Sequence, residues 1–162
     1  MTAIIRDVCD QDLKEALILN EAVVPAVNSI PLEKLRWFAE EASYFRVAMH
    51  EGRLGAFLIG LRPGIDYESE NYRWFCANYD DFGYIDRVAV ADHARRQGLG
   101  TAMYDDFREF LPQTAGVMTC EIYIDPPAIT SIRFHERYGF TRVGTQKNDN
   151  GSKEVALMAR DL

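Results

Sequence analysis

Val88–Tyr104, which reads Val-Ala-Val-Ala-Asp-His-Ala-Arg-Arg-Gln-Gly-Leu-Gly-Thr-Ala-Met-Tyr, is the most informative stretch of this sequence. It continues an apolar, β-branched run that starts at Ile85 and favours a strand. A short polar turn with two arginines and two glycines follows. From Leu99 the apolar residues recur with a helical period, and Pro112 ends that helix. The predicted apolar stripe of this helix consists of Leu99, Ala102, Met103, Phe107, Phe110 and Leu111. The stretch therefore predicts a strand, a glycine-containing turn and a helix.

The turn is suited to binding a phosphate group. The first turn of a helix leaves amide N–H groups without intrahelical partners, and the helix dipole makes that end partly positive. Gly98 and Gly100 carry no side chains, so an anion can approach the backbone closely. Arg95 and Arg96 add forked donors that suit phosphate oxygens. We therefore expect a pyrophosphate site here, although neither the three-glycine dinucleotide fingerprint nor Gly-Lys-Ser/Thr is present.

The turn also carries a family signature. Arg95–Gly100 fits the pattern Arg/Gln-x-x-Gly-x-Gly/Ala directly after a Val-x-Val strand, and this resembles the acetyl-CoA signature of the GNAT acyltransferase superfamily. In that family the turn binds the cofactor's pyrophosphate and the preceding strand binds its pantetheine arm. The resemblance implies acetyl-CoA (coenzyme A) as the cofactor. It assigns cofactor binding to Val88, Ala89 and Val90 on the strand and to Arg95, Arg96, Gln97, Gly98, Gly100 and Thr101 in the turn.

Length and composition indicate one ordinary globular domain over residues 1–162, with 48% apolar and 27% charged residues. A net charge of −7 argues against a nucleic-acid partner and is compatible with a cationic substrate. No apolar stretch of about 18 residues and no secretory signal is seen, so no membrane partner is expected. The widely spaced Cys9, Cys76 and Cys120 favour reduced thiols and a cytoplasmic location. The three scattered histidines lack metal-ligand spacing, so no metal site is expected.

The remaining periodicity predicts a mixed α/β (α+β) architecture. Strands are expected at Ala3–Val8, Tyr44–Met49, Leu54–Leu61, Tyr84–Val90, Val117–Ile124, Phe140–Gln146 and Lys153–Ala159. Helices are expected at about Gln11–Val23 with Asp10 as N-cap, after Pro31, from Leu99, and at about Pro127–Tyr138 with Asp125 as N-cap.

This order of elements again resembles the GNAT fold, a mostly antiparallel sheet flanked by helices. In that family the sheet splays open beside the glycine turn, between strands that correspond here to Tyr84–Val90 and Val117–Ile124. The resemblance implies that the acyl-pantetheine arm enters this splay and pairs with main-chain groups left free there.

Asp66–Phe82 is the least regular part of the chain and lies outside the resemblance. It interleaves aromatic and acidic residues, and a loop of this length in a compact domain is often functional. Three interpretations stay open: substrate binding, aromatic pinning of the segment onto the core, and a homodimer contact.

A second motif lies at Ser131–Phe140, which reads Ser-Ile-Arg-Phe-His-Glu-Arg-Tyr-Gly-Phe. It resembles the closing segment of the GNAT family, Ala/Ser-x-x-Phe-Tyr-x-x-x-Gly-Phe, although Ala128 stands where the family often has Asn. The resemblance implies that Ser131, Phe134 and Arg137 contact the cofactor.

His135 occupies the position where many family members have the tyrosine that protonates the departing CoA thiolate. An imidazolium can donate a proton near neutral pH, so His135 is a candidate general acid. The alternative is that His135 packs in the core or lies on the surface.

Acyl transfer to an amine requires the neutral amine, so a base must remove a proton. The candidates are Tyr84 and Asp86 on one strand and Glu121 and Tyr123 on another. Strand alternation places Tyr84 and Asp86 on the same face. Asp86 and Glu121 interrupt apolar runs, which is costly unless they are paired or functional. An ion pair or a solvent-facing position is the alternative for both, and the sequence does not choose between the candidates.

The sequence thus predicts an acetyl-CoA-dependent N-acyltransferase of EC 2.3.1 type. The acetyl group passes directly to a primary amine of a small molecule or peptide, with the substrate as nucleophile. Acidic residues between Asp66 and Asp81 suggest that this amine is cationic. Two alternatives remain: a non-catalytic acyl-CoA-binding sensor or regulatory protein, and a transferase for a longer acyl-CoA.

Overall fold

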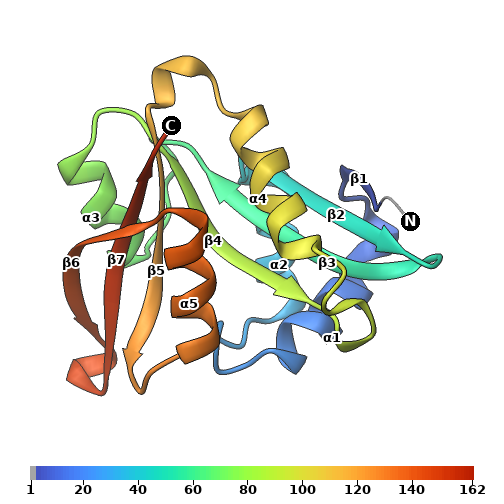
Figure 1. Cartoon of the computed structure of the whole chain (residues 1–162). Coiled ribbons are helices and arrows are strands. Elements are labelled where there is room, and N and C mark those ends of the chain that lie inside the picture. Colours follow the sequence, from blue (N-terminus) through green and yellow to red (C-terminus); the bar gives the residue numbers. More distant parts are fainter. Residues whose placement is uncertain (1–2) are drawn as a thin grey trace. The chain divides into compact units, whose positions relative to one another are not determined.

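The structure is a computed structural model that describes residues 3–162 (Figure 1). Its seven-stranded sheet has the order β1-β2-β3-β4-β5-β7-β6 and is mostly antiparallel, which confirms the predicted mixed α/β architecture. In chain order the elements are β1 Ile4–Asp7, α1 Leu13–Ala22, α2 Leu32–Glu41, β2 Tyr44–His50, β3 Arg53–Leu61, α3 Glu70–Asn78, β4 Gly83–Val90, α4 Leu99–Phe110, β5 Val117–Asp125, α5 Ile129–Tyr138, β6 Thr141–Asn148 and β7 Lys153–Asp161.

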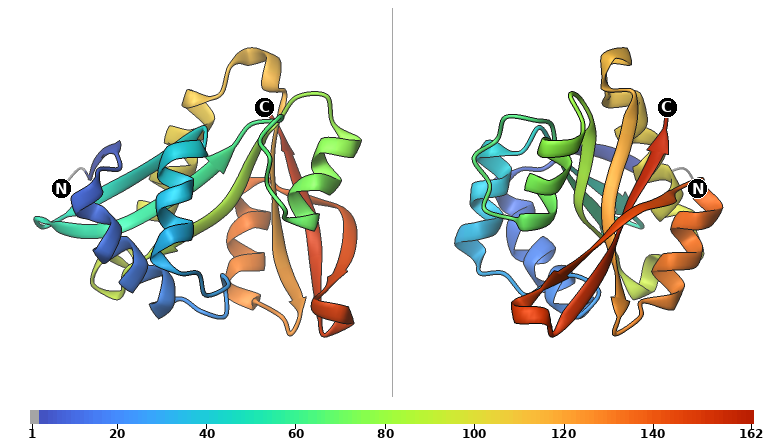
Figure 2. Two further views of the ribbon diagram at one scale, coloured as in Figure 1. Left: turned by 180° about the vertical axis from the view of Figure 1, so that it is seen from behind. Right: turned by 90° about the vertical axis from the view of Figure 1, so that its left-hand side faces the viewer.

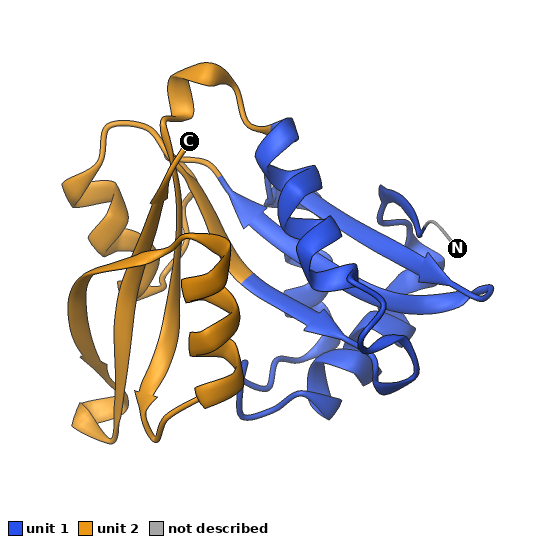
Figure 3. Ribbon diagram, in the orientation of Figure 1, with its two compact units in different colours: residues 1–61, 87–110 blue, residues 62–86, 111–162 orange. Residues whose placement is uncertain are grey.

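The chain divides into two compact units (Figure 3). Unit 1 holds the described residues through Leu61 together with Arg87–Phe110, and unit 2 holds Arg62–Asp86 and Leu111–Leu162. The first half of β4 belongs to unit 2 and its second half to unit 1. The assignment of residues 1–162 to a single domain stays a prediction.

In unit 1, α4 packs directly on β3 because two glycines leave room for it. A Cβ atom on Gly55 would lie 2.8 Å from Leu99 Cδ2, and a Cβ atom on Gly60 would overlap the Phe107 ring. Helices α1 and α2 cover the other face of these strands (Figure 2). Strand β3 is therefore buried on both faces, apart from its first residue.

We expect Gly60→Ala to destabilise the protein by about 1–3 kcal/mol, because the added methyl group overpacks the contact with Phe107. Urea unfolding measures the change. Adding Phe107→Leu makes space at the same contact, so the double variant should lose less than the sum of the single losses. Strict additivity would contradict the direct packing of Phe107 on Gly60.

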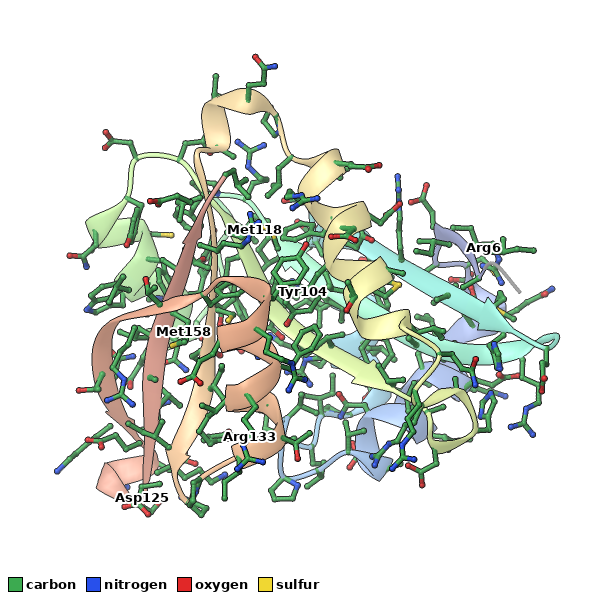
Figure 4. The ribbon with its side chains drawn as sticks, viewed as in Figure 1. Arg6, Tyr104, Met118, Asp125, Arg133 and Met158 are labelled. Atoms are coloured by element: carbon green, nitrogen blue, oxygen red, sulfur yellow. The ribbon has the colours of Figure 1, made fainter. Side chains whose placement is uncertain are left out.

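The buried side of α4 largely matches the predicted apolar stripe. Leu99, Met103 and Phe107 are buried, whereas Phe110 stays 39% exposed. Tyr104, labelled on α4 in Figure 4, is only 1% exposed and lies outside the predicted stripe. The buried face of α4 therefore includes Tyr104 in addition to the apolar residues that the helical period predicts.

Arg87, the charged neighbour of Asp86, is buried within unit 1 and has amide partners there. Its Nη1 donates to Asn20 Oδ1 at 2.9 Å and its Nη2 donates to Asn28 Oδ1 at 2.8 Å. The guanidinium also lies 5.5 Å from the centre of the Phe38 ring. These contacts tie the second half of β4 to α1 and to the segment that follows α1.

In unit 2, β7 lies between β5 and β6 and is antiparallel to both. The first two residues of β4 pair in parallel with β5, with Gly83 opposite Met118 and Tyr84 opposite Thr119. Helices α3 and α5 cover opposite faces of this part of the sheet (Figure 2). The predicted terminal hairpin is confirmed as β6 and β7.

The expectation of an irregular Asp66–Phe82 segment is wrong, because α3 occupies Glu70–Asn78. The Ser69 hydroxyl caps this helix by accepting a hydrogen bond from the Tyr72 amide. Tyr72 and Phe75 are buried on one side of the helix. Trp74 and Cys76 are apolar but lie outside this buried side, so the sequence shows no clear helical period here.

Two predicted helix starts are also wrong. Asp10 does not cap α1, which begins at Leu13 after a 3-10 turn; instead Asp12 accepts a hydrogen bond from the Cys9 amide at 2.8 Å. Asp125 ends β5 rather than capping α5, which begins at Ile129 with Ala128 at its N-cap. Within residues 3–162, no helix has the length and apolar character needed to cross a membrane.

Candidate functional site

The glycine turn of unit 1 presents an open stretch of backbone. Gly98 has φ of +74°, a conformation that favours glycine, and a Cβ atom there would meet no atom within 4 Å. The Ala102 amide donates to the Gly98 carbonyl at 2.9 Å. The amides of Leu99, Gly100 and Thr101 precede that bond, so they have no intrahelical acceptor. This geometry fits an anion placed against the backbone at Gly98.

The charge around the turn also fits a pyrophosphate. Arg95, Arg96 and Gln97 are exposed, and the first turn of α4 contains no acidic residue. Arg95 Nε lies 3.0 Å from Asp92 Oδ1, but the two side chains are 65% and 92% exposed. A pair so open to solvent is weak, so a phosphate can compete for the guanidinium. The residues predicted to hold the cofactor pyrophosphate thus lie together in unit 1.

The strand residues predicted to bind the pantetheine arm alternate in burial. Val88 and Val90 are half-exposed, whereas Ala89 is buried. Beyond β4, the Ala91 amide donates to the Gly55 carbonyl of β3 at 2.8 Å. The side chains of Val88 and Val90 therefore lie on the more open face of the strand, and their contact with the cofactor stays a prediction.

Tyr84 and Glu121 are hydrogen-bonded in unit 2. The Tyr84 hydroxyl donates to Glu121 Oε2 at 2.7 Å and lies 2.9 Å from Oε1. Burial raises the pKa of Tyr84 well above its ordinary value, and the charges of Glu121 and Asp86 raise it further. Tyr84 is therefore a neutral hydrogen-bond donor near neutral pH, and Glu121 is its acceptor.

Asp86 forms a second pair of the same kind. The Tyr67 hydroxyl donates to Asp86 Oδ1 at 2.7 Å. The charges of Asp86 and Glu121 both raise the pKa of Tyr84, so both carboxylates lie near its hydroxyl. Both carboxylates are half-exposed. The structure thus places two carboxylates near Tyr84, each bonded to a tyrosine hydroxyl.

His135 is 4% exposed and lies against Phe140, with ring centres 5.3 Å apart. Its Nδ1 lies 2.7 Å from the Ser131 carbonyl oxygen. Because a carbonyl oxygen only accepts, Nδ1 carries a proton. Burial lowers the pKa of His135, so its neutral form prevails near neutral pH. Phe134 and Ser131 are half-exposed, and Arg137 is exposed on the same helix.

The lowered pKa of His135 makes stability depend on pH. The unfolded chain binds this proton near the ordinary pKa of 6.5, while the buried imidazole still resists it. The free energy of unfolding should therefore hold above about pH 6.5 and fall as the pH drops below it. We expect His135→Phe to flatten this fall relative to wild type and to the exposed-site variant His93→Phe. Urea unfolding between about pH 7 and pH 5 measures it, and an unchanged slope would contradict a neutral, buried His135.

A pocket of about 280 Å³ lies beside α5 in unit 2. Buried apolar residues of the sheet form much of its wall, and no predicted site residue lines it. The lining residues are Ile122, Ile124, Ile132, Glu136, Phe140, Thr141, Arg142, Ala156 and Met158; Met158 is labelled in Figure 4.

The chain matches a known family over most of its length. A family model described as the acetyltransferase (GNAT) family matches residues 14–140. The chain belongs to this family. GNAT acetyltransferases are transferases of EC 2.3.1 type, and acetyl-CoA is their acyl donor. A search of curated proteins found no match to this GNAT protein.

Solved structures share its fold. Ard1 from Thermoplasma volcanium superposes with a TM-score of 0.77 at 20% identity, covering 100% of this chain and 99% of that chain. The ribosomal-protein-S18-alanine N-acetyltransferase from Escherichia coli gives 0.74 at 16% identity, covering 99% and 94%. NAA60 from Arabidopsis thaliana, solved with a bisubstrate analogue, gives 0.77 at 16% identity, covering 99% and 98%. At these identities the likeness shows the fold.

Tyr67 is the residue near the carboxylates that the sequence does not single out. The density of aromatic and acidic residues draws attention to Asp66–Phe82 as a whole. Nothing in the spacing distinguishes Tyr67 from the neighbouring aromatics, because its partner Asp86 lies 19 residues away. Only the folded path of the segment pairs the two groups.

Proposed function

We propose that this GNAT protein transfers the acetyl group of acetyl-CoA directly to a primary amine. The open turn at Gly98 carries this proposal. Three amides without intrahelical acceptors and two exposed arginines suit the pyrophosphate of the donor. Acetyl-CoA supplies an activated thioester. The residues of this chain bind the thioester donor and accept a proton from the amine.

The carboxylates of unit 2 suit the acceptor. A primary amine is mostly an ammonium ion near neutral pH, and two half-exposed carboxylates near Tyr84 favour a cation. In the proposed reaction, Asp86 or Glu121 accepts one ammonium proton, directly or through water, and the neutral nitrogen attacks the thioester carbon. The other carboxylate holds the substrate in place.

The proton balance closes without a separate acid. After the C–N bond forms, the C–S bond breaks and the thiolate takes the second proton that the nitrogen releases. The products are the amide, coenzyme A with its thiol, and one protonated carboxyl group. His135 as general acid stays a prediction, and His135→Phe with unchanged kcat would remove that role.

Two classes of acceptor fit this proposal: peptide or protein N-termini, and small cationic amines. Two structural neighbours are ribosomal-protein-alanine N-acetyltransferases, from Escherichia coli and Brucella melitensis, and this favours a peptide or protein N-terminus as the acceptor. The acidic residues of segment 66–81 favour a cationic acceptor such as a polyamine or an amino sugar. Both classes present an ammonium group to Asp86 and Glu121.

A turnover screen tests the proposal. The purified protein is incubated with acetyl-CoA and, separately, with peptides carrying free N-termini, spermidine or glucosamine, and acetylated products are detected by mass spectrometry. A product in one class supports the transferase and names its acceptor. Acetyl-CoA binding without any product would favour the acyl-CoA sensor. Products formed only from butyryl-CoA or octanoyl-CoA would favour the transferase for a longer acyl group.

We also infer a cytoplasmic location from the cysteines. Cys9 and Cys76 are exposed free thiols, and Cys120 is a buried one. Exposed free thiols are typical of reducing compartments. The possible homodimer stays a prediction.

A further inference from the structure

Segment 62–82 of unit 2 is held in place by Tyr72. This side chain is 1% exposed, and its hydroxyl donates to the Arg62 carbonyl oxygen at 2.7 Å. The same hydroxyl oxygen accepts a hydrogen bond from the Ile65 amide at 3.1 Å. One buried phenol therefore ties α3 to the start of the segment.

Other contacts anchor the ends of the segment and its helix. Arg62 Nη2 pairs with Asp81 Oδ1, which closes the segment near its ends. From α3, Asn71 Oδ1 accepts a hydrogen bond from Gln146 Nε2 of β6 at 2.7 Å. The segment is thus bound both to itself and to the sheet, so a side chain that it carries can be held in a defined place.

Tyr67 is such a side chain. It is 8% exposed, and its ring centre lies 5.7 Å from that of Tyr72. Its carbonyl oxygen accepts a hydrogen bond from Arg73 Nε at 3.1 Å, which holds the backbone at this point. Its hydroxyl donates to Asp86 Oδ1 at 2.7 Å. Packing and a main-chain contact therefore determine where this hydroxyl reaches Asp86.

A short hydrogen bond to a carboxylate limits the rotation of that carboxylate. Glu121 of β5 accepts its own hydrogen bond from the Tyr84 hydroxyl, and the charges of Asp86 and Glu121 both raise the pKa of Tyr84, so both carboxylates lie near this hydroxyl. Two like charges in one region repel each other, and hydrogen-bond donors offset that repulsion. Tyr67 and Tyr84 supply those donors from different parts of unit 2.

We propose that Tyr67 is a positioning residue that orients the Asp86 carboxylate for the acceptor amine. This inference rests on the proposed acetyl transfer and deepens it. It gives the aromatic segment 62–82 a part in the reaction: the segment carries the hydroxyl that sets the geometry of one of the two carboxylates.

The functional test is Tyr67→Phe, which removes only the hydroxyl. Tyr79→Phe is the matched control, because Tyr79 lies on the same segment and packs on Phe75 with ring centres 6.1 Å apart. With acetyl-CoA and the best amine of the turnover screen, we expect Tyr67→Phe to lower kcat/KM for the amine about tenfold. The KM for acetyl-CoA should stay within about twofold, since a misplaced carboxylate does not affect donor binding.

A readout that needs no acceptor is the NMR signal of Tyr67 labelled with ¹³C at Cζ. We expect this signal to differ between wild type and Asp86→Asn, because a neutral amide oxygen is a weaker acceptor than a carboxylate. An identical signal in wild type and Asp86→Asn would overturn the contact. Wild-type activity with unchanged kinetics in Tyr67→Phe would overturn the positioning role. A wild type that acetylates no amine would instead overturn the proposed function, and the positioning role with it.

Discussion

Gly98→Glu should weaken acetyl-CoA binding at least 100-fold. Gly98 has φ of +74°, and the space beyond its Cα is open, so the site accepts a close anion. A glutamate fills that space and adds a negative charge where the pyrophosphate must lie. The strain of a side chain at this φ acts in the same direction. Equilibrium dialysis with radiolabelled acetyl-CoA measures the loss.

The chain offers a matched control for this substitution. Gly52, in the turn between β2 and β3, also has φ of +74°, and a Cβ atom there would meet no atom within 4 Å. Gly52→Glu therefore introduces the same charge and the same backbone strain elsewhere in unit 1. Gly98→Gln separates bulk from charge and should lose less affinity than Gly98→Glu. Equal affinities for Gly98→Glu and Gly52→Glu would remove the turn from the cofactor site.

Loss of the two carboxylates should lower turnover by at least 100-fold. General base catalysis contributes about 10²–10⁴-fold, and Asp86→Asn with Glu121→Gln leaves no carboxylate of the pair to accept the ammonium proton. Both substitutions keep the shape of the side chain and an oxygen that accepts from Tyr67 or Tyr84. Steady-state kinetics with acetyl-CoA and the best amine of the screen measures the loss.

The single variants assign the roles within the pair. The variant that lacks the proton acceptor should lose kcat and the acid limb of its pH profile, whereas the other should mainly raise KM for the amine. Glu136→Gln on α5, where Glu136 is exposed, removes a carboxylate from unit 2 without touching the pair and should keep wild-type kinetics. A double variant with more than half of wild-type kcat would exclude both carboxylates from proton transfer.

Much of the fold follows from local patterns. The strands and α4 carry strong periodicity, so the sequence predicts their positions to within one or two residues. Helix α3 escapes prediction because the half-exposed Trp74 and the exposed Cys76 lie beside the buried Tyr72 and Phe75, so its apolar residues do not follow a helical period. The predicted caps of α1 and α5 are misplaced because aspartate is not confined to helix N-caps: Asp10 begins the 3-10 turn before α1 and Asp125 ends β5.

The candidate site likewise has parts that the sequence predicts and parts that it does not. The turn at Gly98 is predictable because its chemistry resides in consecutive backbone groups. Asp86 and Glu121 are predictable as candidates because each interrupts an apolar strand. The pairing of these carboxylates with tyrosines is not predictable. Tyr67 is 19 residues from Asp86 in the sequence, and Tyr84 is 37 residues from Glu121. The burial of His135 depends on packing against Phe140, which helical spacing alone does not reveal.

Calorimetric titration of the purified protein with acetyl-CoA tests the central claim most directly. Binding heat does not depend on thiol release, so the three cysteines of the chain do not interfere. The account predicts saturable binding of one acetyl-CoA per chain, displaced by coenzyme A. The absence of binding heat with acetyl-CoA, butyryl-CoA and octanoyl-CoA at two temperatures would contradict it and leave the fold without the proposed activity.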